Sequence, residues 1–114
     1  MHALLDEPRL AAFAGSPEPV VFARIARDWA ASVPAHRAAI RDADGEALPE
    51  ALHELRSGAV AVGLPLLAAT LAGIEQRAER GTPPAAGEID AALALADRSA
   101  AELLAWWDRA GVRG

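Results

Sequence analysis

Helix-breaking residues divide this chain into segments whose apolar residues repeat with the period of an α-helix. Glycine and proline cluster near positions 15–19, 45–49, 63–65 and 81–87. Between these breaks alanine is the commonest residue, whereas valine, isoleucine and threonine are sparse and do not alternate with polar residues. Alanine favours helices, and strands that are half buried require alternation. The pattern therefore predicts an all-α protein.

Two helices are predicted before residue 45. The first spans about Asp6 to Ala14 and ends at Gly15. Ser16 followed by Pro17 is typical of an N-cap and a first helical residue, so the second helix is expected to start there. Pro34 is expected either to kink this helix or to begin a new short one. The predicted buried face of the second helix consists of Phe22, Ile25, Trp29 and Val33.

The rest of the chain is expected to hold three helices. One runs from about Glu46 to Val62 and stops at Gly63, and Pro65 begins the next, which makes a tight helical hairpin. The last begins at about residue 85 or 88. Its predicted buried side consists of Ile89, Leu93, Ala96, Ala100, Leu103 and Trp107. Four long amphipathic helices joined by short turns predict an antiparallel, up-down four-helix bundle with a short extra N-terminal helix.

Length and composition exclude several classes of protein. We expect residues 1–114 to form a single domain. The absence of cysteine excludes disulfides and thiolate zinc sites, and a formal net charge of −5 argues against nucleic-acid binding. The longest apolar run is too short and too interrupted for membrane insertion, and the N-terminus lacks a signal-peptide pattern. A cytoplasmic protein is therefore expected.

One histidine in the third predicted helix points away from the core. At about 100° per residue the apolar positions of this helix fall on one side, and His53 lies about 140° from Leu48. Arg56, Ser57 and Val60 share the outward sector with His53. Such a surface suits chemistry that is carried out jointly with another protein.

The residues after this histidine follow a distinctive spacing. His53 is followed by Leu55 at +2, a basic residue at +3, small residues from +4 to +6, glycine at +10 and an Ile-Glu pair at +21 and +22; these are Arg56, Ser57, Gly58, Ala59, Gly63, Ile74 and Glu75. The spacing resembles the histidine-containing phosphotransfer (HPt) domain of bacterial multistep phosphorelays, over about residues 22–80. That family usually has glycine at +4, where this chain has Ser57.

The resemblance implies a phosphorelay intermediate. His53 would accept a phosphoryl group and pass it to or from an aspartate of a response-regulator receiver domain, because imidazole offers a nucleophilic nitrogen near pH 7. Arg56 would offset the added negative charge. The Mg²⁺ would belong to the receiver domain, so the chain is expected to need no metal or cofactor of its own and to have no independent catalytic turnover. A histidine kinase or hybrid sensor kinase is the other implied partner, and the chain is expected to be a monomer.

Further residues are assigned around this site. The expected partner contacts are Ser57, Gly58, Val60 and Leu64, and Gly63 is expected to be structural support as a helix stop. The Ser57 hydroxyl could bond the phosphoryl group, or it could bond back to a carbonyl of its own helix. Arg56 could instead pair with Glu54 or Asp108, and Glu75 could simply pair within the bundle. The alternative function is a non-phosphorylated HPt-like docking or inhibitory module that binds a kinase or receiver domain.

Overall fold

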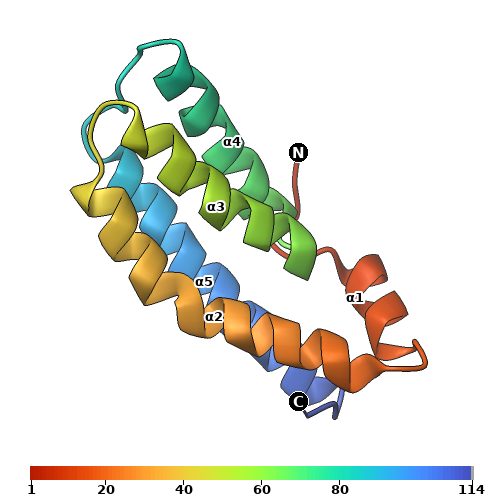
Figure 1. The fold of residues 1–114 in the computed structure, drawn as a ribbon. Helices are drawn as coiled ribbons and strands as arrows, with labels where there is room; N and C mark the ends of the chain where they lie inside the picture. Colours follow the sequence, from red (N-terminus) through yellow and green to blue (C-terminus); the bar gives the residue numbers. More distant parts are fainter. Residues whose placement is uncertain (114) are drawn as a thin grey trace.

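The computed structural model of the protein describes residues 1–113, and over that range its regular elements are five helices with no strand: α1 (Glu7–Ala14), α2 (Pro19–Asp42), α3 (Ala47–Val62), α4 (Pro65–Glu79) and α5 (Glu88–Arg109). The predicted all-α class is confirmed. The most extensive packing is between α3 and α4, which lie side by side, while α2 contacts both α3 and α5 (Figure 1). The short α1 packs against α2 near the C-terminal end of α3.

The start of α2 differs from the prediction. The helix begins at Pro19 with Glu18 as its N-cap residue, so the expected start at Ser16 and Pro17 is wrong. The Ser16 hydroxyl donates instead to the carbonyl oxygen of Phe13 at 2.7 Å, which closes the end of the preceding helix α1. Proline still occupies the first helical position, where a missing N–H costs least.

Helix α2 is continuous over 24 residues and contains Pro34 in its interior. The alternative of a new helix beginning at Pro34 is therefore wrong. Trp29 and Val33 are buried as predicted, but Ile25 is exposed, so its assignment to the buried face is also wrong. The inward positions near Ile25 are taken by the smaller Ala23 and Ala26, which allow close approach of the neighbouring helices.

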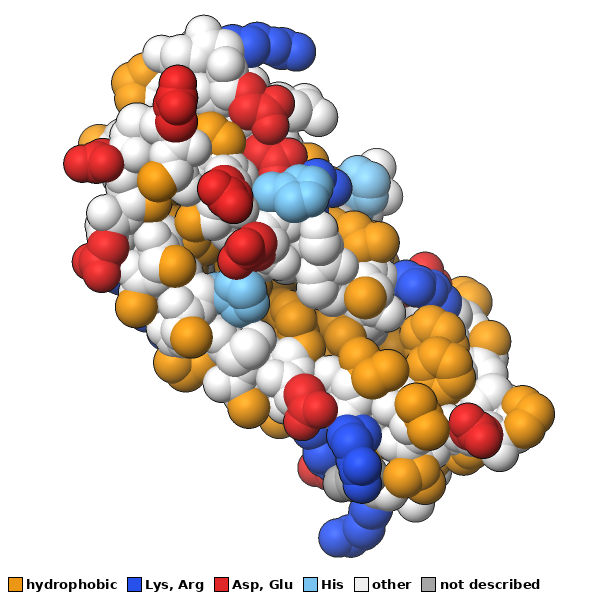
Figure 2. Space-filling view, in the orientation of Figure 1, with side chains coloured by type: hydrophobic (Ala, Val, Ile, Leu, Met, Phe, Trp, Pro, Cys, Tyr) orange, Lys and Arg blue, Asp and Glu red, His pale blue; other side chains and the backbone are white. Residues whose placement is uncertain are grey.

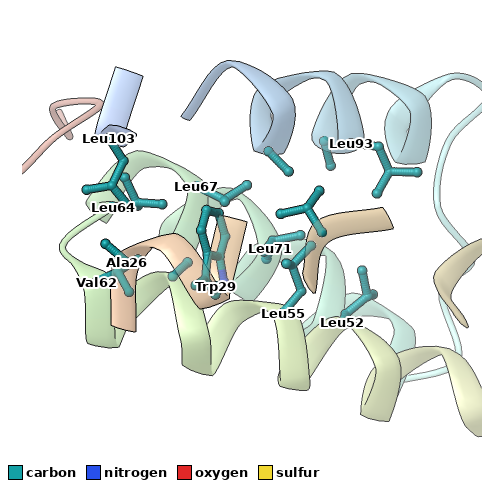
Figure 3. Close-up of a cluster of buried hydrophobic side chains, with 14 of the residues drawn as sticks. Ala26, Trp29, Leu52, Leu55, Val62, Leu64, Leu67, Leu71, Leu93 and Leu103 are labelled. Carbon is teal, nitrogen blue, oxygen red and sulfur yellow. The ribbon is translucent and has the colours of Figure 1, made fainter. Parts of the chain in front are cut away.

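The core lies between α2, α3, α4 and α5. Figure 3 shows the Trp29 ring of α2 among leucine side chains from facing helices, including Leu55 of α3 and Leu67 and Leu71 of α4. The last helix contributes Ala92, Leu93, Ala96, Leu103 and Trp107. Burying each large apolar side chain contributes on the order of 1.5–3 kcal/mol. This burial fixes which side of α3 faces inward and so which side is left for solvent.

A tight turn joins α3 to α4. Gly63 adopts a left-handed conformation with φ of 87°, and the N–H of Leu64 donates to the carbonyl of Ala59 while that of Gly63 donates to Val60. This is a Schellman motif, in which the residue after the glycine packs its apolar side chain back onto the helix. The predicted helix stop at Gly63 and restart at Pro65 are confirmed. The turn sets the register between the two helices.

A partly exposed ion pair joins the end of α4 to the start of α5. The guanidinium of Arg77 donates to the carboxylate of Glu88, which also accepts the N–H of Ala85 at 3.0 Å. Hydrogen bonding by Arg77, reinforced by Ala85, lowers the pKa of Glu88 from its ordinary value. The pair braces the loop of residues 80–87.

The surface is divided by chemical type. Figure 2 shows hydrophobic side chains gathered over α1 and the beginning of α2, whereas acidic side chains gather toward the opposite end of the same face. Exposed apolar residues include Val20, Val21, Ile25 and Val60. Within residues 1–113, the helices are either too short or too polar to cross a membrane.

Candidate functional site

His53 lies in the middle of α3 and points away from the core. Its neighbours Leu52 and Leu55 are fully buried, which orients the helix and turns the histidine outward. The imidazole is 56% exposed, so the predicted outward direction of His53 is confirmed. One edge of the ring nevertheless rests against the neighbouring helix α4. The histidine is therefore accessible to a partner and also held by a second element of the fold.

The contact from α4 is made by Glu75. Oε1 of this carboxylate lies 3.0 Å from Nδ1 of His53, and the Glu75 side chain is only 7% exposed. A carboxylate that far from water needs hydrogen bonds and a countercharge. The imidazole of His53, on the solvent-facing side of α3, supplies one hydrogen bond to the Glu75 carboxylate.

Arg56 supplies the countercharge. One turn along α3 from His53, its Nη2 lies 3.2 Å from Oε2 of Glu75 and its Nε lies 3.4 Å from Oε1. Arg56 therefore pairs with Glu75. The two alternative partners that the sequence offered, Glu54 and Asp108, are not the ones it contacts. Asp108 pairs with Arg27 instead, at 3.4 Å.

The two neighbours of Nδ1 compete for it. Nη2 of Arg56 lies 2.7 Å from Nδ1, and Oε1 of Glu75 lies 3.0 Å from the same atom. Nδ1 can donate to the carboxylate or accept from the guanidinium, but it cannot do both at once. The Glu75 side chain is 7% exposed and that of Arg56 is 26% exposed, so the carboxylate has less access to water and depends more on a donor from the imidazole. The buried negative charge therefore favours a proton on Nδ1, which leaves the lone pair on Nε2.

Nε2 is the ring nitrogen that faces outward, and Ser57 lies beside it. Ser57 Oγ is 3.4 Å from Nε2, one turn along α3, and the serine is exposed. The alternative in which the Ser57 hydroxyl bonds back to a carbonyl of its own helix is not what the structure contains. The site thus runs from the buried Glu75 through the imidazole to a hydroxyl at the surface.

Two of the expected partner-binding residues, Gly58 and Leu64, pack against other parts of the protein instead. Leu64 is fully buried, because the Schellman turn folds its side chain onto the core, so its expected role as partner surface is wrong. A Cβ at Gly58 would lie 2.5 Å from Cδ1 of Trp29, so the missing side chain makes room for the tryptophan of α2 rather than for a partner. Val60 is 48% exposed and Ser57 is exposed, so both remain accessible.

Gly63 has the supporting role expected of it. Beyond its left-handed φ, its carbonyl accepts the N–H of Asp6 at 2.9 Å, and a Cβ there would come within 3.2 Å of Leu10 Cδ2. The N-terminal segment is thereby tied to the hairpin that carries the site. This position supports the site without touching it.

From the sequence alone Glu75 is half of the Ile-Glu pair and could simply pair within the bundle, and it has no part in the predicted site. A signal was present, because Glu75 follows Leu67 and Leu71 at intervals of four and so continues the buried stripe of α4. A carboxylate in an apolar stripe must find partners from another element. Which partners it finds depends on the hairpin register.

Within the described residues 1–113, the histidine and carboxylate side chains form no group of three or more that could hold a metal ion. Comparisons of this chain with protein-family models, with curated proteins and with solved structures find no match.

Proposed function

We propose that this protein is a phosphorelay intermediate of the HPt type, in which Nε2 of His53 accepts a phosphoryl group and passes it on. The observation that carries the proposal is the buried carboxylate of Glu75 on Nδ1, because it presents the lone pair of the outward nitrogen to an incoming group. The proposal includes the antiparallel four-helix arrangement of α2 to α5, with α1 as an addition.

The chemistry requires little from the chain besides the histidine. In the forward direction the Nε2 lone pair attacks the phosphorus of an aspartyl phosphate, in line with the P–O bond that breaks. The aspartate leaves as a carboxylate with the electron pair of that bond. A receiver domain would supply both this aspartate and the Mg²⁺ that neutralises charge on the transferred group. The reverse reaction returns the phosphoryl group to an aspartate, so the protein is a carrier without turnover of its own.

Glu75 has a defined role in this reaction. Since Nδ1 keeps its proton, the ring becomes an imidazolium when Nε2 forms the N–P bond. A carboxylate 3.0 Å from Nδ1 stabilises that positive charge, as the buried aspartate does for the imidazolium of serine proteases. Arg56 compensates the buried charge of Glu75 and holds it in place. Direct support of the phosphoryl group by Arg56 stays a prediction.

The decisive experiment follows the phosphoryl group. Receiver domains phosphorylated with ³²P, with Mg²⁺, should transfer label to the protein as an acid-labile, base-stable phosphate. His53→Gln should abolish the label, while the matched variant His2→Gln, which removes an exposed histidine elsewhere, should keep it. Equal labelling of the His53→Gln variant would overturn the proposal. Binding of a receiver without any transfer would favour a docking or inhibitory module instead.

A further inference from the structure

The Ser57 hydroxyl has a different environment from the hydroxyls of Ser16, in the turn after α1, and Ser32 of α2. The hydroxyls of Ser16 and Ser32 donate to carbonyl oxygens three residues earlier, at 2.7 and 2.6 Å. Ser57 Oγ has a hydrogen bond only to Nε2 of His53 within the part of the chain that the structure describes. A serine in a helix can satisfy its hydroxyl on the backbone, although the buried Ser99 of α5 has no hydrogen-bond partner within the described residues. The Ser57 hydroxyl is directed at the nitrogen that would carry the phosphoryl group.

The direction of this hydrogen bond follows from the other edge of the ring. With the Nδ1 proton donated to Glu75, Nε2 has only a lone pair to offer, so the hydroxyl of Ser57 is the donor. At 3.4 Å the contact is long, and the small side chain at the helix surface is free to rotate. An approaching phosphorus would therefore displace a weak bond from Nε2.

We propose that Ser57 is a positioning residue for the phosphoryl group on His53, an inference that rests on the proposed function. Once the N–P bond has formed, the hydroxyl loses its acceptor at Nε2 and meets the phosphoryl oxygens instead. A hydrogen bond to an anionic oxygen is roughly twice as strong as one between neutral groups. Ser57 thus holds the phosphorylated state more tightly than the resting state, and it slows loss of the phosphoryl group.

The test uses a small phosphoryl donor, so that no partner protein is needed. With potassium phosphoramidate, Nε2 attacks phosphorus, the P–N bond of the donor breaks and ammonia leaves. The half-life of the phosphohistidine at neutral pH is then followed by ³¹P NMR. Ser57→Ala, which removes the hydroxyl and keeps Cβ, should shorten this half-life roughly threefold to tenfold. Ser57→Thr, which keeps a hydroxyl, should restore most of it.

Two further measurements separate this role from a structural one. The ¹⁵N chemical shift of Nε2 in the unphosphorylated protein should change in Ser57→Ala, because the lone pair loses its donor. The melting temperature should stay the same or rise, since alanine is the better helix former.

The possible failures are distinguishable. Equal half-lives for the wild type and Ser57→Ala, with label on His53 in both, would overturn the role of Ser57 and leave the proposed function standing. Absence of phosphohistidine at His53 under phosphoramidate and under every phosphorylated receiver would overturn both.

Discussion

The carboxylate of Glu75 lies 3.0 Å from Nδ1 of His53, although 22 residues separate them along the chain. The two side chains meet because the turn at Gly63 sends α4 back along α3 with a fixed register. A buried acid on one edge of an exposed imidazole makes the two edges of the ring unequal. The site's chemistry depends on that inequality more than on the exposure of the histidine.

Glu75→Gln should slow phosphoryl capture by His53. The amide has nearly the same shape but no charge to stabilise the imidazolium, so we expect a rate loss of roughly 100-fold, at the lower end of the range for positioned acid–base groups. Rapid-quench measurement of transfer from a phosphorylated receiver would give the rate. Glu79→Gln, one turn further along α4 and exposed, is the matched control and should transfer normally. An unchanged rate in Glu75→Gln would contradict the assigned role.

Gly58 and Gly73 should respond in opposite directions to alanine. A Cβ at Gly58 would meet the Trp29 ring at 2.5 Å, whereas one at Gly73 of α4 has nothing within 4 Å. Gly58→Ala should therefore lower the free energy of unfolding by about 1–3 kcal/mol. Gly73→Ala should raise it by roughly 0.5–1 kcal/mol, because glycine is a poor helix former. Urea unfolding of both variants measures the contrast, and stabilisation by Gly58→Ala would show that the packing is looser than described.

Substitutions at Val60 and Leu64 should have different effects, one on receiver binding and the other on stability. Leu64→Ala should lower the free energy of unfolding by about 2–5 kcal/mol, as expected for a buried leucine. Val60→Asp should leave stability within about 0.5 kcal/mol. If Val60 contacts the partner, the same variant should weaken receiver binding roughly tenfold. Calorimetric titration gives the affinity, with Ala101→Asp on the exposed side of α5 as the control; equal affinities would remove Val60 from the docking surface.

The ion pair between Arg77 and Glu88 should make the stability of the fold depend on pH in the acidic range. Hydrogen bonding by Arg77 lowers the pKa of Glu88, so the folded state binds this proton less readily than the unfolded chain does. The contribution is therefore complete above the ordinary value of 4.5 and is lost as the pH falls through the lower folded value. Melting temperatures of the wild type and Glu88→Gln should differ at pH 7, and the difference should be smaller at pH 3. A difference that is the same at both pH values would contradict this linkage.

Local sequence signals determined most of the secondary structure. Gly63 and Pro65 ended and restarted helices where expected, because a left-handed glycine and an N-terminal proline act through their own backbone. The outward direction of His53 also followed from the helical period, since flanking leucines determine which face is buried. The predicted start of α2 was two residues too early. Pro17 and Pro19 could each occupy the first helical position, and local signals do not rank the two starts.

Contacts between helices were decided by tertiary structure alone. The pairing of Glu75 with His53 and Arg56 depends on how α4 lies against α3, and helical periodicity within one segment carries no information about that register. The same is true of Gly58: the space that its side chain would take is occupied by the Trp29 ring from α2. The sequence by itself determined an all-α chain with an outward histidine. Only packing between helices decided that this histidine has a buried carboxylate at one nitrogen and a serine hydroxyl at the other.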